Sequence, residues 1–345
     1  MRLKVAQLYE IAGMPDYGEM LRQAELDVEF LKKPSFTEEE IIANARDADA
    51  IIGIGTHQPF SKKVMDNLPK CRFIMSVGIG YDQIDVSAAT VNCILVANVP
   101  DYCWEEVSDH IMALILSCSR RVVQLNTEVK KGGWRSEPVS HIQTKIWPGM
   151  SKLKEQTLGL IGFGAISRAL SGKARAFGLK MLAYDPYISS EIFSEYGVER
   201  VSELNQILTK SDIVAINVNL TPENRHMIGM PQFKMMRSNA CIINTARGPL
   251  IDGKALYVAL KEGYISIAAV DVTEPEPISL DDPLLKLDNF IVTAHSAHYS
   301  PPAYQELVYR PGQEIIRLFK KGEWPKGLLN PEIKQDYIKK WGELE

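Results

Sequence analysis

A glycine turn between two strand patterns constrains the fold of this chain more than any other feature. Residues 157–161 favour a strand, the turn Gly162-Phe163-Gly164 follows, a helical stretch comes next, and a second strand pattern ends at Asp185. This order is typical of a dinucleotide-binding βαβ unit. Gly162 permits the tight turn, and Gly164 lets the backbone approach a pyrophosphate, whose charge the helix N-terminus favours.

Two positions of this unit decide its details. Ser167 stands where the pattern has a third glycine, and we expect only small size to matter there, because the helix packs closely on the strand. Asp185 is expected to accept hydrogen bonds from the adenosine ribose. Its carboxylate would repel a 2′-phosphate, and Pro186 and Tyr187 supply no cation, so we expect NAD as the cofactor. Taken alone, the glycines also fit an ordinary turn of another α/β protein.

Strand and helix patterns alternate in two blocks, which predicts two α/β domains with parallel sheets, Rossmann-like or flavodoxin-like, and a cleft between them. The first block has strand patterns at residues 4–8, 50–54, 73–77 and 94–97; the second has six, at 158–161, 181–184, 213–218, 240–244, 267–271 and 290–293. A helical pattern at 105–128 links the blocks, and another, at 304–321, follows the last strand. If this last helix returns to the first block, residues 1–101 and 302–345 form a discontinuous substrate domain and residues 102–301 the NAD-binding domain.

Composition excludes several classes of protein. The chain has 345 residues, 46% of them hydrophobic, and a net charge of −4 without a long basic run, which argues against nucleic acid or an anionic membrane as partner. No apolar stretch approaches the roughly 18 residues that span a bilayer. The five cysteines lack CxxC spacing, so neither a disulfide framework nor a metal site is expected. A cytoplasmic enzyme is the expectation.

Three later strand patterns each end in residues that can carry chemistry. Arg247 follows residues 240–244, Glu274 and Glu276 follow 267–271, and His295 follows 290–293. Because ligands bind at the carboxyl ends of strands in open α/β sheets, we expect an arginine, a carboxylate and a histidine at one rim.

These motifs, with SVGIGYDQID at residues 76–85, resemble those of the D-isomer-specific 2-hydroxyacid dehydrogenases over nearly the whole chain. Further support comes from NVPDYCWEEVSDH at 98–110, NTARGPLID at 244–252 and HSAHYS at 295–300. Within that family the strings are most similar to the branch of the C-terminal-binding-protein corepressors and their bacterial relatives. The family's catalytic histidine usually follows a Thr-Pro pair, whereas Ala294 precedes His295 here.

The resemblance implies an NAD-dependent oxidoreductase that interconverts a small 2-keto acid and its D-2-hydroxy acid by hydride transfer. It implies His295 as general acid/base, Glu276 as its carboxylate partner, and Arg247 as the residue that binds and polarises the substrate. Together with the glycine turn, it assigns cofactor contacts to Gly162, Phe163, Gly164, Ala165, Ile166, Asp185, Val218, Asn219, Asn224, Thr245, Ala246, Arg247, Asp271, His295 and Ala297, and substrate contacts to Ile79, Gly80, Arg247, His295 and His298.

The chemistry gives independent reasons for such a set. Hydride transfer to a carbonyl carbon builds negative charge on the oxygen, so a general acid must lie within hydrogen-bond reach. A carboxylate behind the imidazole stabilises the imidazolium and raises its pKa above about 6.5. Only the family spacing favours Glu276 over Glu274, which we expect to be solvent-exposed.

The other histidines leave alternatives open. His298 fits a second acid, a wall of the substrate pocket or a metal ligand, and metal is disfavoured because no further cysteine or histidine stands at ligand spacing. We interpret His298 as a specificity residue. His57, His110, His141 and His226 resemble surface or helix-packing residues, and only His57 is placed near the pocket.

Two function classes and an assembly follow. The favoured function is the dehydrogenase, and the alternative is an NAD(H)-sensing, corepressor-like module that binds proteins with little turnover. We expect a homodimer formed through the helical pattern at 105–128 and the arm at 131–152, whose tryptophans, Trp134 and Trp147, would be buried against a partner.

Overall fold

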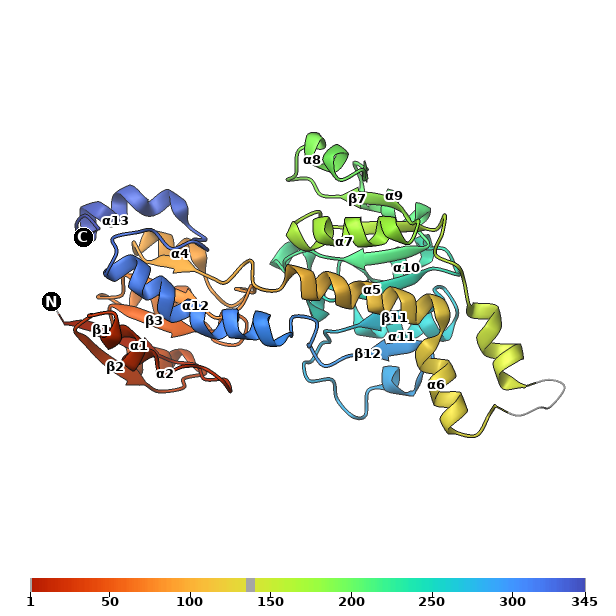
Figure 1. Cartoon of the computed structure of the whole chain (residues 1–345), viewed down its shortest axis with the longest axis horizontal. Coiled ribbons are helices and arrows are strands. Elements are labelled where there is room, and N and C mark those ends of the chain that lie inside the picture. Colours follow the sequence, from red (N-terminus) through yellow and green to blue (C-terminus); the bar gives the residue numbers. More distant parts are fainter. Residues whose placement is uncertain (1, 135–139, 345) are drawn as a thin grey trace. The chain divides into compact units, whose positions relative to one another are not determined.

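The structure is a computed structural model that describes residues 2–134 and 140–344. The chain divides into two compact units: unit 1 is Met1–Tyr102 with Ser300–Glu345, and unit 2 is Cys103–Tyr299 (Figure 1). Each contains one parallel sheet, so the predicted fold class of two α/β domains is confirmed. The predicted boundaries, 101/102 and 301/302, differ from those of the units by one and two residues.

Unit 1 has a five-stranded parallel sheet in the order β2-β1-β3-β4-β5. Its strands are β1 (Leu3–Gln7), β2 (Val28–Lys32), β3 (Ala50–Gly53), β4 (Phe73–Ser76) and β5 (Leu95–Ala97). The sequence predicted only four strands, and β2 was missed. It lies at the edge of the sheet with Glu29 and Lys32 exposed, so its pattern lacks the apolar run of a central strand.

The helices of unit 1 come from both ends of the chain. They are α1 (Tyr17–Gln23), α2 (Glu38–Ala45), α3 (Lys62–Asp66), α4 (Val86–Val91), α12 (Pro301–Phe319) and α13 (Lys334–Trp341). Thr37 and Glu40 form a capping box at the start of α2. Helix α12 packs on α1, and the buried Tyr17 hydroxyl donates to the Val308 carbonyl at 2.6 Å, which fixes the returning helix in this unit (Figure 1).

Unit 2 has a seven-stranded parallel sheet in the order β12-β11-β10-β9-β6-β7-β8. Its strands are β6 (Thr157–Ile161), β7 (Lys180–Tyr184), β8 (Glu199–Arg200), β9 (Ile213–Ile216), β10 (Cys241–Asn244), β11 (Ile267–Val270) and β12 (Phe290–Val292). The prediction of six strands was wrong because β8 was missed. It has two residues, both exposed at the sheet edge, and therefore no hydrophobic pattern.

The helices of unit 2 are α5 (Trp104–Arg120), α6 (Val122–Lys130), α7 (Ala165–Ala176), α8 (Ser190–Glu195), α9 (Leu204–Lys210), α10 (Met230–Met235) and α11 (Gly253–Lys261). One helix was predicted over 105–128, but the chain breaks at Arg121, whose φ is 52°. The buried Arg121 guanidinium donates to the Gly149 carbonyl at 3.1 Å and to the Ser266 hydroxyl. A tertiary contact thus overrides the continuous helical pattern.

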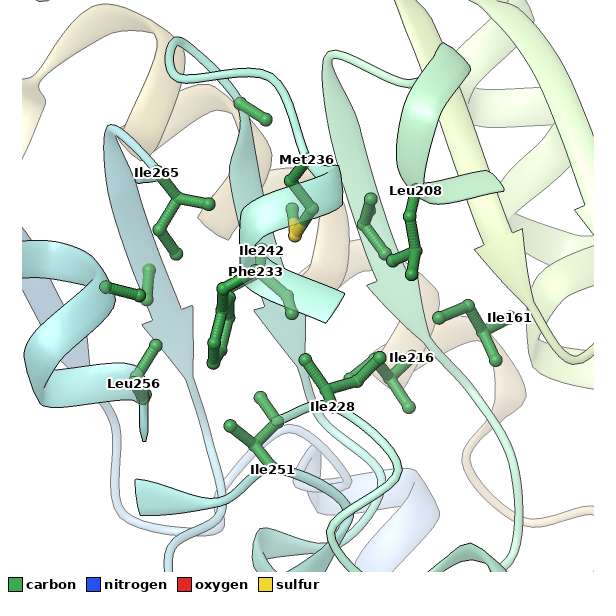
Figure 2. Close-up of a cluster of buried hydrophobic side chains, with 14 of the residues drawn as sticks. Ile161, Leu208, Ile216, Ile228, Phe233, Met236, Ile242, Ile251, Leu256 and Ile265 are labelled. Carbon is green, nitrogen blue, oxygen red and sulfur yellow. The ribbon is translucent and has the colours of Figure 1, made fainter. Parts of the chain in front are cut away.

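One face of the unit 2 sheet packs against α9, α10 and α11. Figure 2 shows Ile242 of a central strand beside Phe233 of α10; Ile161 and Ile216 of other strands and Leu256 of α11 belong to the same cluster, and all five are buried. On the other side, α5 lies along α7 (Figure 1). Burial on both faces explains why the central strands read as continuous apolar runs. Among the described residues, no helix combines the length and the apolar character that a membrane crossing needs.

Candidate active site

The glycine turn joins β6 to α7. Gly162 has a φ of 91°, in the left-handed region that favours glycine. Gly164 is the N-cap of α7 and makes no side-chain cap, and a Cβ built on it would meet nothing within 4 Å. Open space therefore lies before the first amides of the twelve-residue helix, at Ala165 and Ile166. This arrangement fits a pyrophosphate.

Ser167 has a larger role than its size. The fully buried hydroxyl donates to the Gly162 carbonyl at 2.7 Å and accepts from the Asn217 side chain at 3.0 Å. It therefore ties the glycine turn to the loop after β9. The expectation that only small size matters at this position was incomplete, because sequence patterns do not reveal hydrogen bonds between segments 50 residues apart.

Asp185 is held by the backbone. One carboxylate oxygen accepts from the Phe163 amide and the other from the Tyr187 amide, both at 2.9 Å. The Phe163 ring is buried and stacked on Phe193, with centroids 4.6 Å apart, so Phe163 supports the turn from inside. Phe163 is among the residues assigned to the cofactor, and its amide orients the Asp185 carboxylate.

An open pocket of about 370 Å³ lies beside Asp185. It is lined by Tyr184, Asp185, Pro186, Arg200, Val201 and Ser202. Arg200 was not anticipated, because it comes from β8, the strand that the sequence did not reveal. Pro186 and Tyr187 supply no cation, as expected, but Arg200 brings one to the lining of the same pocket.

The loop after β10 carries Arg247. Asn244, buried at the strand end, donates through its side chain to the Arg247 carbonyl at 2.8 Å and accepts from the Ala246 amide at 3.0 Å. The Arg247 guanidinium donates to the Ala246 carbonyl at 2.7 Å. The backbone of this loop, including the half-buried Thr245, is thus fixed by a buried amide.

His295 and Glu276 form a hydrogen-bonded pair. His295 Nδ1 contacts Glu276 Oε1, and each side chain is 39% exposed. Burial raises the pKa of Glu276, but the hydrogen bond and the charge of His295, with Arg247 nearby, lower it by more, so its pKa lies below the usual range. Glu276 therefore stays ionised at neutral pH. Among the hydrogen bonds of the described residues, the ring of His295 uses Nδ1.

The backbone of His295 is also unusual. Its φ is 50°, a left-handed conformation that non-glycine residues adopt mainly where the surroundings enforce it. The His295 amide donates to the Asp271 carbonyl at 2.8 Å, and the Asp271 carboxylate accepts from the Ser296 and Ala297 amides at 3.0 and 2.8 Å. Asp271 is 2% exposed, so a buried residue holds the loop that carries His295.

Asp271 was assigned to the nicotinamide site, and its carboxylate is engaged by the protein. Besides the two amides, it accepts from the Thr293 hydroxyl at 2.5 Å. His110 of α5 lies 3.0 Å from the same hydroxyl and 3.7 Å from the carboxylate. The sequence analysis interpreted His110 as a surface or helix-packing residue. The one sequence feature that indicated another role was the place of this polar residue on the apolar side of the helical pattern.

Glu274 does not face solvent as expected. Its carboxylate is 29% exposed, contacts Arg225, and lies 2.7 Å from His226 Nε2. Glu276 rather than Glu274 contacts His295. The glutamate that the family spacing favoured is therefore the one that contacts His295 in the structure.

His298 lies edge-on to His295, with ring centroids 6.0 Å apart. Burial and the charge of His295 lower the pKa of His298, so the ring is neutral near pH 7 and suits a pocket wall better than a second acid. Within the described ranges, no three His, Cys, Asp or Glu side chains gather to form a candidate metal site.

The remaining cofactor assignments fall on the loop after β9. The Asn224 side chain accepts from the Thr221 amide and donates to the Asn219 carbonyl, both at 2.8 Å. Asn224 thereby closes the turn that follows Val218.

Unit 1 carries the other predicted substrate residues in the loop after β4. The carbonyl of Gly78 accepts from the Val99 amide at 3.0 Å, and that of Ile79 accepts from the Asn98 side chain at 2.7 Å. In the part of the chain that is described, the hydrogen bonds of this loop leave the amides of Ile79 and Gly80 unused. His57, the only other histidine expected near a pocket, stacks on Tyr9 with centroids 6.3 Å apart.

The chain is similar to a known protein family and to several known proteins. Residues 112–297 match the family described as D-isomer specific 2-hydroxyacid dehydrogenase, NAD binding domain. The chain is 38% identical over 295 residues to a glyoxylate reductase of Korarchaeum cryptofilum, which covers 85% of this chain and 86% of that protein.

Two solved structures are similar over almost their full length. A glyoxylate reductase from Paecilomyes thermophila has a TM-score of 0.83 and 26% identity, over 96% of this chain and 99% of that one. A D-lactate dehydrogenase from Aquifex aeolicus, complexed with NAD and lactic acid, has a TM-score of 0.76 and 26% identity, over 93% of this chain and 96% of that one.

Proposed function

We propose that this chain, which belongs to the D-isomer specific 2-hydroxyacid dehydrogenase family, reduces a small 2-keto acid with His295 as its proton donor. The family membership makes the protein an NAD-dependent oxidoreductase. The observation that carries the residue assignment is the His295–Glu276 pair beside the loop of Arg247.

When NADH is bound, it supplies the hydride. The chain's own residues then have separate tasks: Arg247 binds the substrate carboxylate and polarises its carbonyl, and His295 gives a proton to the developing alkoxide. Glu276, ionised at neutral pH, stabilises the imidazolium and holds its tautomer. In the reverse direction, neutral His295 accepts the proton.

Unit 1 contributes to substrate binding in this proposal. The amides of Ile79 and Gly80 are donors that the described hydrogen bonds do not use, and donors of this kind bind carboxylates well. His298 forms the pocket wall that limits the substrate side chain. Its neutral, half-buried ring favours a small or apolar group there.

The substrate class follows from the relatives. The relatives reported above are named as glyoxylate reductases or as a D-lactate dehydrogenase complexed with lactic acid, so we propose glyoxylate, pyruvate or a comparably small 2-keto acid. The finer resemblance to the corepressor branch gains no support from these relatives. A complete Arg247, Glu276 and His295 set favours turnover over a protein-binding module.

We propose a homodimer for the assembly. Helix α6 contacts the segment Ile142–Ile146, which lies within the predicted arm, and large apolar side chains are exposed in this region. They are Val122, Val123, Val129, Trp134 and Trp147, with 41–80% of each exposed. The predicted arm, 131–152, falls partly outside the described residues. We also propose a cytosolic location, consistent with five free cysteines.

The test is a panel of 2-keto acids assayed by NADH oxidation. We expect turnover of the smallest members by the wild-type protein and a kcat lower by about 10²- to 10⁴-fold in His295→Gln, with NADH affinity kept. Equal turnover by wild type and His295→Gln would refute the assignment.

A further inference from the structure

Three loops at the carboxyl edge of the unit 2 sheet contact one another. We call residues 225–228, 247–251 and 273–276 the loop cluster. The first two are joined by backbone bonds, from the His226 amide to the Pro249 carbonyl at 2.7 Å and from the Ile228 amide to the Leu250 carbonyl at 3.1 Å. Figure 2 shows Ile228 and Ile251 of these two loops side by side, where they form a parallel bridge.

The second and third loops touch backbone to backbone. A Cβ built on Gly248 would lie 2.0 Å from the Thr273 carbonyl oxygen, far inside van der Waals contact. Only glycine allows this approach next to Arg247. The segment that carries Arg247 is therefore pressed against the one that carries Glu276.

Glu274 joins the third loop to the first. One oxygen of its carboxylate contacts the Arg225 guanidinium, and the other lies 2.7 Å from His226 Nε2. Each oxygen thus has its own partner, which fixes the orientation of the side chain. The His226 backbone has a φ of 54°, so its ring reaches Glu274 from a constrained residue.

We infer that Glu274 is a positioning residue that holds Glu276 in line with His295, an inference that rests on the function proposed above. The two glutamates are separated by one residue, so fixing the first limits the movement of the second. Ion pairs of this exposure contribute little to global stability, and the effect is therefore expected in the alignment of the catalytic pair.

The groups around the His295 ring allow a displacement of Glu276 to be measured. Among the described residues of unit 2, the titratable and charged groups near its ring include Glu276, the neutral His298, the buried Asp271 and, through Glu276, Arg247. Glu276 forms a hydrogen bond to the ring. A misplaced Glu276 therefore removes this hydrogen bond, which the NMR signals of the ring report.

The experiment compares Glu274→Gln and Arg225→Gln with Arg237→Gln in the full-length protein. Arg237 is a matched control: it pairs with Asp212 at 2.7 Å at the amino edge of the same sheet and is 46% exposed, against 51% for Arg225. Arg225→Lys keeps the cation and serves as the conservative rescue. The readouts are kcat, KM, NADH affinity and the NMR signals of the His295 ring, which report its hydrogen bond to Glu276.

We expect Glu274→Gln and Arg225→Gln to lower kcat about 10-fold, since small misplacements of catalytic groups are costly. The NMR signals of the His295 ring should change in both, while NADH affinity stays unchanged; Arg237→Gln should alter none of these, and Arg225→Lys should recover most of the kcat. Unchanged ring signals in Glu274→Gln would overturn the inference even if the wild type is active. If those signals change while the wild type reduces no 2-keto acid, the positioning role stands and the proposed function fails.

Discussion

Glu274 and Glu276 are chemically identical and two residues apart, yet they contact different partners. Glu276 contacts His295, and Glu274 contacts Arg225 and His226. The pKa of Glu276 is lowered mainly because the neighbouring imidazole outweighs the effect of burial. At the residue scale, the two carboxylates therefore differ in the basic side chain that each one contacts.

The acid-base role of His295 predicts opposite pH dependences. Reduction needs the imidazolium and should fade as pH rises, whereas oxidation of the hydroxy acid needs neutral imidazole and should increase over the same range. Because the pKa of Glu276 lies below its usual range, the titration of Glu276 is separated from that of an imidazole. Initial rates in both directions from pH 5 to 9, roughly the range of histidine titration, check this; parallel profiles would exclude His295 as the acid.

Ser167 gives a second residue-scale prediction. Ser167→Ala removes the donor to Gly162 and leaves the Asn217 amide without its acceptor, a loss of about 1–3 kcal/mol in stability around the glycine turn. NADH affinity should fall severalfold by fluorescence titration. Ser171→Ala, which removes a bond of 2.8 Å within α7, is the control and should bind NADH normally.

We expect cofactor choice to depend on two residues that line one pocket, Asp185 and Arg200. Asp185 disfavours a 2′-phosphate and Arg200 attracts it, so Asp185→Ala should raise kcat/KM for NADPH about 10-fold or more relative to NADH. Adding Arg200→Gln should reverse this gain. If Asp185→Ala keeps full discrimination against NADPH, the acid is not the determinant.

At the scale of elements, the site consists of loops fixed at the carboxyl ends of parallel strands. The Asn244 amide shapes the loop after β10, and Asp271 shapes the histidine loop after β12. Both are buried, so a strand end holds each loop through satisfied polar groups. The strands thereby hold the loops in place, and the loops carry the candidate site residues.

The contact between two of these loops can be tested at Gly248. Gly248→Ala places a methyl group 2.0 Å from the Thr273 carbonyl, so the loops must separate. We expect a loss of stability of about 1–3 kcal/mol, as for other overpacked sites, and a kcat lower by about 10-fold or more. Gly253→Ala at the start of α11, with nothing within 4 Å, should leave Tm and kcat unchanged.

At the scale of the whole molecule, both termini of the chain build unit 1, and unit 2 is continuous. The chain therefore crosses between units twice, once before α5 and once before α12. The exposed apolar side chains near α6 belong to unit 2, the part that matches the NAD-binding family. This placement makes unit 2 the expected site of self-association.

The proposed dimer predicts sensitivity to a charge in that region. Val129→Asp should give a monomeric mass by light scattering at micromolar concentration, because a buried unpaired carboxylate is costly. Val258→Asp on α11 is matched in exposure, 42% for both valines, and should leave the dimer intact. A wild-type protein of monomeric mass would contradict the proposal.

The sequence by itself determined the central strands, the glycine turn and the residues able to carry chemistry, because hydrophobic periodicity and glycine conformation are local properties. It did not reveal β2 and β8, which lie at sheet edges and lack apolar runs, or the break at Arg121, whose partner Ser266 is 145 residues away.

Only the tertiary structure decided which glutamate meets His295, that Ser167 ties the turn to Asn217, and that His110 reaches the loop of Asp271. These contacts join side chains from separate strand ends. Their geometry follows from the order of the strands in the sheet, and local sequence patterns do not reveal that order.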